Sequence, residues 1–195
     1  MQDQKTTIED VSNPFNLTIK SNIQMQIPRQ FKEFTIERLI HESNMSAVFL
    51  AKTQNHEVAI KFIPLKILDR SSVYLIYYQL HFCMPSFESL HYPDQRFYAV
   101  VMPLAMCDMI DYLEKNVFLE ENEVCYIMNQ VFEYISYLHE KNICHGDLKI
   151  ERILLMNRQV SYNFYNSKHF RINISGSIHA KFIDDQEQYT SGTVL

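Results

Sequence analysis

The sequence predicts an α+β fold in which a strand-rich part comes first and a helical part follows. Short runs rich in β-branched residues fill residues 34–63. Residues 120–142 repeat their apolar positions every three or four residues, as one face of a helix does. Strands segregated from helices along the chain favour two lobes over an alternating α/β arrangement.

The expected elements follow in chain order. Residues 1–33 are polar with scattered apolar residues, so we expect a flexible leader there. Strands are expected at residues 34–40, 46–52, 57–63 and 96–104, with a turn at 41–44. Helices are expected at residues 71–82, 106–116 and 120–142. Short extended runs are expected near residues 151–156, 170–174 and 180–183.

Composition narrows the function classes. The net charge of −5 argues against nucleic-acid binding, which favours a basic face. The polar N-terminus lacks the apolar core of a signal peptide, and the apolar run at residues 99–106 is too short to span a bilayer. Four cysteines without a CxxC pair indicate reduced thiols, as in the cytoplasm or nucleus. We therefore expect no nucleic-acid partner and no membrane association.

Two motifs occur in a telling order. VAIK at residues 58–61 ends a predicted strand, and HGDLKIERILL at residues 145–155 follows the strong helix. Together they resemble the third-strand lysine and the catalytic-loop pattern HRDLKxxNILL of the eukaryotic protein kinases. The resemblance implies a kinase-like fold, with a β-rich N-lobe over residues 34–104 and an incomplete helical C-lobe over residues 105–195. The C-lobe would end in the activation segment.

A closer branch is suggested by three stretches. HGD in place of HRD, IYYQL at residues 76–80 and INISGSIHAKF at residues 172–182 resemble the Bub-type spindle-checkpoint kinases. That resemblance implies protein partners of the kinetochore or checkpoint, and a location in the cytoplasm or nucleus.

The resemblance assigns three residues of the N-lobe to ATP. Lys61 would contact the phosphates, while Val48 and Ala59 would enclose the adenine. An ordinary core role for Val48 and Ala59, and a solvated role for Lys61, remain open alternatives. The glutamate that holds this lysine in the family is replaced by Val73.

The phosphate-covering loop also departs from the family. Its three glycine positions fall on His41, Ser43 and Ser46. Glycines serve there because backbone N–H groups must approach the phosphates closely.

The catalytic loop keeps part of the family pattern. Asp147 would be the base and Lys149 would neutralise the moving phosphoryl group. The metal-binding asparagine falls on Arg152, whose positive charge would repel Mg²⁺ or contact a phosphate in its place. The DFG aspartate falls on Asn173 in one register and on Asp184, within KFIDDQ, in another. A solvated acidic turn is the plain alternative for Asp184.

Three functions remain open on these residues. The replaced glycines, glutamate and metal ligand favour a pseudokinase that acts through protein interactions and binds ATP. Lys61, Asp147 and Lys149 would also suit an active Ser/Thr protein kinase. The third alternative is an interaction domain without a ligand.

Overall fold

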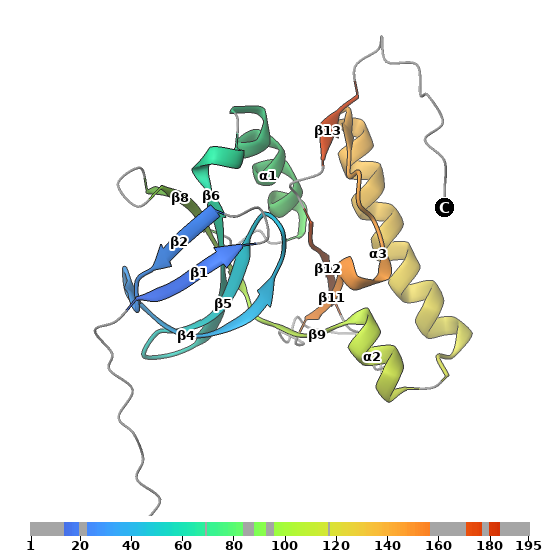
Figure 1. The fold of residues 1–195 in the computed structure, drawn as a ribbon. Helices are drawn as coiled ribbons and strands as arrows, with labels where there is room; N and C mark the ends of the chain where they lie inside the picture. The colour runs from blue at the N-terminus through green and yellow to red at the C-terminus, as the bar shows by residue number, and fades with distance from the viewer. Residues whose placement is uncertain are drawn as a thin grey trace, which may run out of the picture. The chain divides into compact units, whose positions relative to one another are not determined.

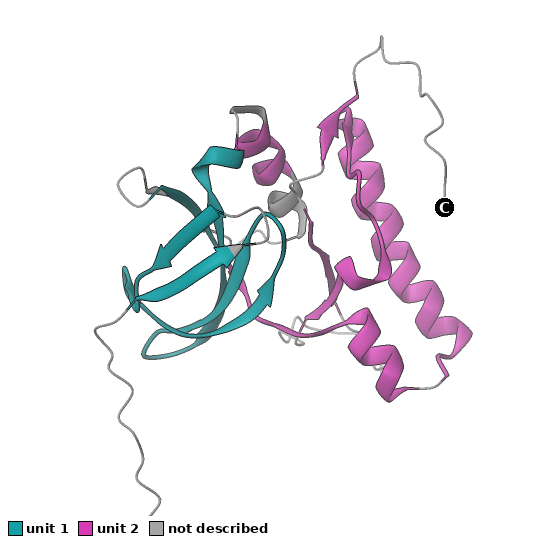
Figure 2. Ribbon diagram, viewed as in Figure 1, with its two compact units in different colours: residues 1–67, 90–101 teal, residues 68–89, 102–195 magenta. Residues whose placement is uncertain are grey.

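The computed structural model describes residues 14–19, 23–68, 70–83, 88–92, 96–116, 118–156, 171–176 and 180–183. The chain divides into two compact units, one of residues 1–67 and 90–101 and the other of residues 68–89 and 102–195 (Figure 2). No helix in the described ranges is long and apolar enough to cross a membrane.

The first unit is built on one six-stranded sheet. Its strand order is β3-β4-β5-β6-β8-β7. β4, β5, β6 and β8 are labelled in Figure 1. The expected strands are present, because β-branched residues fit a sheet. The turn expected at residues 41–44 lies two residues later, at 43–46, because His41 and Glu42 pair with β5. The strands are β3 (Gln30–Phe31), β4 (Phe34–Glu42), β5 (Ala47–Lys52), β6 (Glu57–Pro64), β8 (Phe97–Pro103) and β7 (Glu88–Tyr92). A short 3₁₀ turn, η1 (Leu65–Ile67), follows β6.

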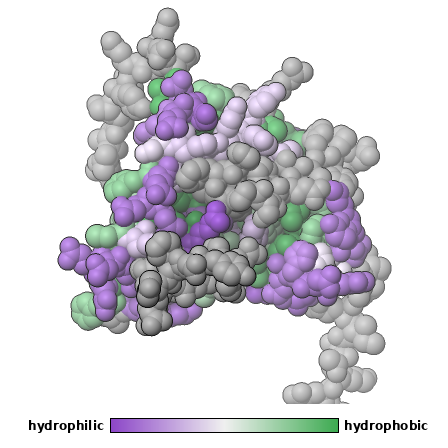
Figure 3. Space-filling model, turned by 180° about the vertical axis from the view of Figure 1, so that it is seen from behind, coloured by the Kyte–Doolittle hydropathy of each residue, from purple (hydrophilic) through white to green (hydrophobic). Residues whose placement is uncertain are grey.

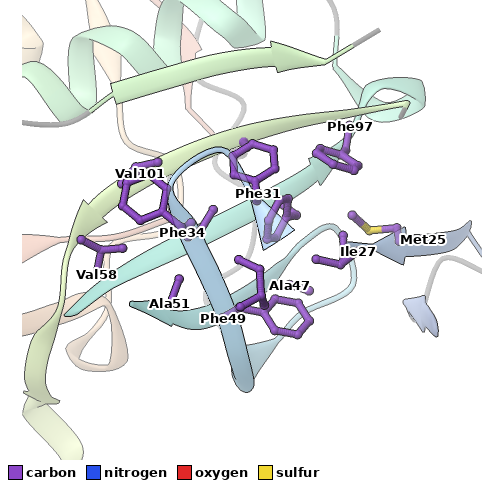
Figure 4. Close-up of a cluster of buried hydrophobic side chains, with 14 residues drawn as sticks. Met25, Ile27, Phe31, Phe34, Ala47, Phe49, Ala51, Val58, Phe97 and Val101 are labelled. Atoms are coloured by element: carbon purple, nitrogen blue, oxygen red, sulfur yellow. The ribbon is translucent and has the colours of Figure 1, made fainter. Parts of the chain in front are cut away.

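An aromatic cluster forms the core of this unit (Figure 4). The Phe62 ring meets Phe31, Phe49 and Phe97 edge to face, with centroids 5.4, 5.8 and 5.0 Å apart. Edge-to-face contacts match the positive ring edge of one aromatic to the negative face of the next. These contacts fix the sheet that carries the VAIK strand.

The expected flexible leader through residue 33 is wrong for residues 15–31. β1 (Phe15–Ile19) and β2 (Ile23–Ile27) form an antiparallel hairpin, and β3 joins the sheet. Met25 and Ile27 are buried in the aromatic cluster (Figure 4). Their burial follows from strict alternation in the IQMQI run, which places every second side chain on one face.

The second unit is mainly helical. Its helices are α1 (Arg70–Cys83), α2 (Met109–Lys115) and α3 (Glu121–Glu140). All three were expected, but residues 106–108, expected to begin the second helix, belong to a strand, and Asp108 caps α2. α1 contacts α3, so it groups with the later elements and not with the N-terminal part in which we expected it. The short strands are β9 (Ala105–Asp108), β10 (Ile143–Cys144), β11 (Ile153–Met156), β12 (Arg171–Ile174) and β13 (Lys181–Phe182). A three-stranded sheet has the order β12-β11-β9, and β10 pairs with β13.

The helix α3 supports the catalytic loop of this unit. Its amphipathic pattern is confirmed, with Ile127, Val131 and Leu138 buried. The repeat of apolar residues would also place Val124 on this face, but Val124 is exposed, whereas Tyr134 is buried. The helix contacts β10, which leads into the HGDLK segment, and β12, which carries Asn173. Burial of α3 therefore positions both ends of the candidate site.

Candidate functional site

The VAIK residues meet Val48 on one face of the first unit's sheet. Val48 lies directly opposite Lys61 in the antiparallel pair of β5 and β6. Opposite residues in such a pair point to the same face, and so do residues two apart on one strand. Lys61, Ala59 and Val48 therefore share a face, opposite to the face that carries Phe49 and Phe62.

In the turn between β4 and β5, the side chain of Ser43 hydrogen-bonds backbone N–H groups of the same turn. The Ser43 hydroxyl oxygen accepts hydrogen bonds from the backbone N–H groups of Met45 and Ser46, at 3.3 and 3.1 Å. The backbone N–H of Ser43 donates to the Ser46 carbonyl at 2.9 Å. The N–H groups of Ser43, Met45 and Ser46 are thus engaged within the turn. This turn, Ser43–Ser46, occupies the place of the family's phosphate-covering loop.

The helix α1 offers no carboxylate to Lys61. Its 14 residues include no Asp or Glu. Val73, the residue at the expected glutamate position, is half-buried. The lysine–glutamate ion pair that the kinase fold uses to place its lysine therefore cannot form with this helix.

The catalytic loop begins at a buried histidine. After α3, Asn142 takes a left-handed conformation with φ of 55°, and β10 leads into His145. His145 is buried, and its Nδ1 accepts a hydrogen bond from the Asp147 backbone N–H at 3.3 Å. Gly146, with φ of 77°, makes the turn between them. This turn fixes the backbone that presents the Asp147 carboxylate.

An ion pair dominates the catalytic loop. Arg152 donates to the Asp147 carboxylate oxygen Oδ2 from both Nε, at 3.0 Å, and Nη2, at 2.6 Å. Both side chains are mostly buried, with 22% and 24% of their surface exposed. The Lys149 ammonium is more distant, 3.9 Å from Oδ1. Asp147 and Arg152, here called the Asp147–Arg152 pair, hold each other by short charge-assisted hydrogen bonds.

The backbone beyond the catalytic loop determines where Asn173 lies. The strand β11 pairs with β12, so that Leu154 lies opposite Asn173. Ser175 donates its backbone N–H to the Arg152 carbonyl at 2.8 Å, which continues this pairing. Asn173 is only 2% exposed. Asp184, the aspartate of the other register, lies outside the described residues.

These residues do not suit a magnesium ion. The guanidinium of Arg152 stands at the position of the family's metal-binding asparagine and already binds the neighbouring carboxylate. A hard dication favours oxygen ligands, and an adjacent fixed cation repels it. Within the described part of the chain, no three His, Cys, Asp or Glu side chains form a group that could hold a metal.

The described site residues fall into two groups. Val48, Ala59 and Lys61 belong to the first unit, whereas the Asp147–Arg152 pair and Lys149 belong to the second. The first group lies on one pair of strands, and the second lies in one loop. Gly176, to which the sequence analysis assigned no role, lies beside Arg152.

Comparison with known proteins identifies the family of this chain. A model of the protein kinase domain family matches residues 34–165, more than half of the chain. Serine/threonine-protein kinase SIK1 of Mus musculus is 30% identical over 143 residues, covering 67% of this chain and 18% of that protein. Aurora kinase B of Mus musculus is 24% identical over 151 residues, covering 71% of this chain and 43% of that protein.

A third relative matches a shorter stretch more closely. The liver/testis phosphorylase b kinase gamma catalytic chain of Bos taurus is 48% identical over 48 residues, covering 25% of this chain and 12% of that protein. The chain thus spans less than a fifth of SIK1 and of this catalytic chain. The chain belongs to the protein kinase family, and the predicted kinase-like α+β fold is confirmed. The Bub-type branch stays a prediction.

Proposed function

We propose that this member of the protein kinase family is a pseudokinase that acts by binding other proteins. The observation that carries the proposal is the double hydrogen bond from Arg152 to Asp147. A kinase base must offer a carboxylate oxygen to the substrate hydroxyl. In this chain Oδ2 is bound by the guanidinium, so the base is occupied by a residue of its own loop.

Loss of the metal ligand acts in the same direction. Metal ions bridge and neutralise the phosphates in phosphoryl transfer, and each lost electrostatic contact costs about 3 kcal/mol of transition-state stabilisation. Arg152 supplies a positive charge but lacks the oxygen ligand that would hold Mg²⁺. The positive charge of Arg152 is therefore bound to Asp147 and, unlike that of Mg²⁺, does not enter the site together with the nucleotide.

The first unit supports the proposal independently. In the Ser43–Ser46 turn, backbone N–H groups donate to the Ser43 hydroxyl, and α1 contains no Asp or Glu that could pair with Lys61. Both departures lie outside the catalytic loop. An active kinase would therefore need a phosphate contact and a metal ligand from other sources.

Nucleotide binding without metal is a second candidate function. Lys61, Ala59 and Val48 share one face of the sheet, which is the arrangement that the family uses for adenine and phosphate. ATP would then be a bound ligand of the domain and not a phosphoryl donor.

The proposed protein partner would meet exposed apolar side chains. In the second unit Phe118 is 91% exposed, Phe132 59% and Met106 56%. On the face drawn in Figure 3, apolar residues (green) lie among hydrophilic ones (purple). Large exposed aromatics favour protein interfaces. A kinetochore or checkpoint partner, and a location in the cytoplasm or nucleus, are the proposals that the Bub-type resemblance adds.

A thermal-shift titration of the purified chain tests the nucleotide and metal claims together. A ligand that binds the folded state alone raises the melting temperature. We expect ATP to raise it equally with and without Mg²⁺, and we expect Lys61→Met to abolish the shift. A shift that requires Mg²⁺ would contradict the metal-free site. No shift from a folded sample would remove nucleotide binding and leave the protein-binding role.

A further inference from the structure

Two of the three glycines in the chain lie beside the Asp147–Arg152 pair. Gly146 directly precedes Asp147, and Gly176 follows β12. Both adopt positive φ angles, 77° and 112°, which side-chain-bearing residues rarely take. The Ser43–Ser46 turn, where the family uses glycines, contains none. Glycine therefore occurs at the ion pair and not at the turn.

The missing side chain of Gly176 leaves room for Arg152. A Cβ atom built on Gly176 would lie 3.0 Å from Arg152 Nε and 3.1 Å from its Cδ. Contacts this short are tighter than nine in ten real Cβ contacts. The same Nε donates one of the two hydrogen bonds to Asp147. Any side chain at position 176 would therefore press on the atom that orients the guanidinium.

The backbone near Gly176 cannot easily withdraw. Ser175 donates its N–H to the Arg152 carbonyl at 2.8 Å, and Ile174 pairs with Ile153. Gly176 itself is buried. Movement of the backbone would break this strand pairing, whereas movement of the arginine side chain would break its bonds to Asp147. The side chain is the softer of the two, because it lies partly in solvent.

We infer that Gly176 is a positioning residue: its missing side chain leaves the room in which the Arg152 guanidinium can bond to Asp147. The inference deepens the proposed function and rests on it in one respect, namely that the ion pair is the resting state of the site. Gly176 acts through space, by leaving open the path along which the arginine side chain runs. Bulk at position 176 would release the carboxylate without changing either charged residue.

A double-mutant cycle in melting temperature tests the inference on the full chain. Gly176→Ala has two costs, backbone strain at positive φ and contact with Arg152. Arg152→Ala removes the second cost and keeps the first. We expect Gly176→Ala to lower the melting temperature about half as much in the Arg152→Ala background as in the wild type. Val131→Ala, a core change on α3, should lower it equally in both backgrounds.

A spectroscopic readout separates positioning from general destabilisation. The Arg152 Nε proton should exchange slowly with water while it is bonded to Asp147, and its NMR signal is assigned by its loss in Arg152→Lys. We expect Gly176→Ala to speed this exchange about tenfold, in the same direction as Asp147→Ala, which removes the acceptor of this hydrogen bond. Val131→Ala should leave the exchange rate unchanged.

Each outcome decides the inference. Equal losses of melting temperature in both backgrounds with unchanged Nε exchange would overturn it. If Gly176→Ala unfolds the wild type but the double variant folds, the coupling is demonstrated. If both are unfolded, backbone strain alone accounts for the glycine and the inference is wrong. Neither measurement uses nucleotide or activity, so failure of the pseudokinase proposal would appear separately.

Discussion

In both the Ser43–Ser46 turn and the catalytic loop, polar groups are hydrogen-bonded by a side chain of the same segment, but the chemical groups differ. In the family both regions receive charged ligands, phosphates at one and a metal with its substrate at the other. In this chain each is satisfied from within. In the turn, the Ser43 hydroxyl oxygen accepts a hydrogen bond from the backbone N–H of Ser46, three residues later. In the loop, the Arg152 guanidinium donates to the carboxylate of Asp147, five residues earlier.

The difference lies in how far each arrangement depends on the rest of the chain. Ser43 bonds to backbone groups of its own turn, so the contact is as local as a side-chain cap. The Arg152 side chain that bonds to Asp147 runs next to Gly176, which follows a different strand. One substitution within the turn is therefore enough to release its N–H groups. The loop should respond to changes at a distance in sequence.

The largest effect is expected at the ion pair. Arg152→Ala leaves the mostly buried Asp147 carboxylate without its two hydrogen bonds. We expect the free energy of unfolding to fall by about 2 kcal/mol, because hydrogen bonds to charged groups exceed neutral ones. Urea denaturation measures this change. Arg152→Lys, which keeps the charge but not the two-donor geometry, should lose less. Unchanged stability in Arg152→Ala would show that the pair does not hold the loop.

A smaller effect is expected at the turn. Ser43→Ala removes the acceptor of the Met45 and Ser46 N–H groups, and we expect a loss of about 1 kcal/mol in urea denaturation. Ser46→Ala is the matched control, because it removes the 3.0 Å hydroxyl contact but leaves both N–H bonds in place. An equal loss in the two variants would mean that the Ser43 oxygen does not organise the turn.

A polar contact outside both regions provides a reference. The Tyr112 hydroxyl donates to Glu123 at 2.6 Å and links α2 to α3. Tyr112→Phe should cost about 0.5 kcal/mol at neutral pH, since the contact is partly exposed. A larger loss than at Ser43 would contradict the assignment of the turn as the stronger contact.

The same tyrosine predicts a pH dependence. Burial, and then the hydrogen bond to Glu123, raise the pKa of Tyr112 from 10.0 to about 12. Its stabilising contribution is therefore complete below about pH 10 and is lost as the pH rises toward 12. Between these pH values the wild type should lose stability relative to Tyr112→Phe, as followed by denaturation at several pH values. A constant difference would contradict the raised pKa.

The smallest effect is expected at Lys149. Its ammonium lies 3.9 Å from Asp147 and its side chain is 47% exposed. Lys149→Ala should change the unfolding free energy by about 0.3 kcal/mol or less, because solvent screens exposed ion pairs. Urea denaturation beside Arg152→Ala tests the ranking of the two cations. A loss equal to that of Arg152→Ala would mean that the carboxylate is held by charge alone.

The fold was largely predictable because its elements carry clear periodicity. The strands of VAIK and its neighbours and the helix α3 follow from β-branched runs and a three-to-four repeat. The hairpin of β1 and β2 was missed, although IQMQI alternates strictly, because its polar composition suggested a leader. Tyr134 was missed because an aromatic with a hydroxyl can lie on either edge of an amphipathic face.

The candidate site was less predictable. The sequence could indicate that Arg152 replaces a metal ligand, but not whether its guanidinium would bind a phosphate or Asp147. A five-residue separation in an irregular loop does not fix side-chain direction. Gly176 had a usable signal, since a glycine in a glycine-poor chain often marks a close approach. The roles of Asn173 and Asp184 stay predictions.

The central claim is that Arg152 keeps Asp147 from serving as a catalytic base. Its most direct test is transfer of the labelled γ-phosphate of ATP, with Mg²⁺, to the chain itself and to a mixed Ser/Thr peptide substrate. Wild type is compared with Asp147→Asn as the catalytically dead control. We predict that the wild type transfers no more phosphate than Asp147→Asn does. Transfer by the wild type that Asp147→Asn abolishes would contradict the claim and identify an active kinase.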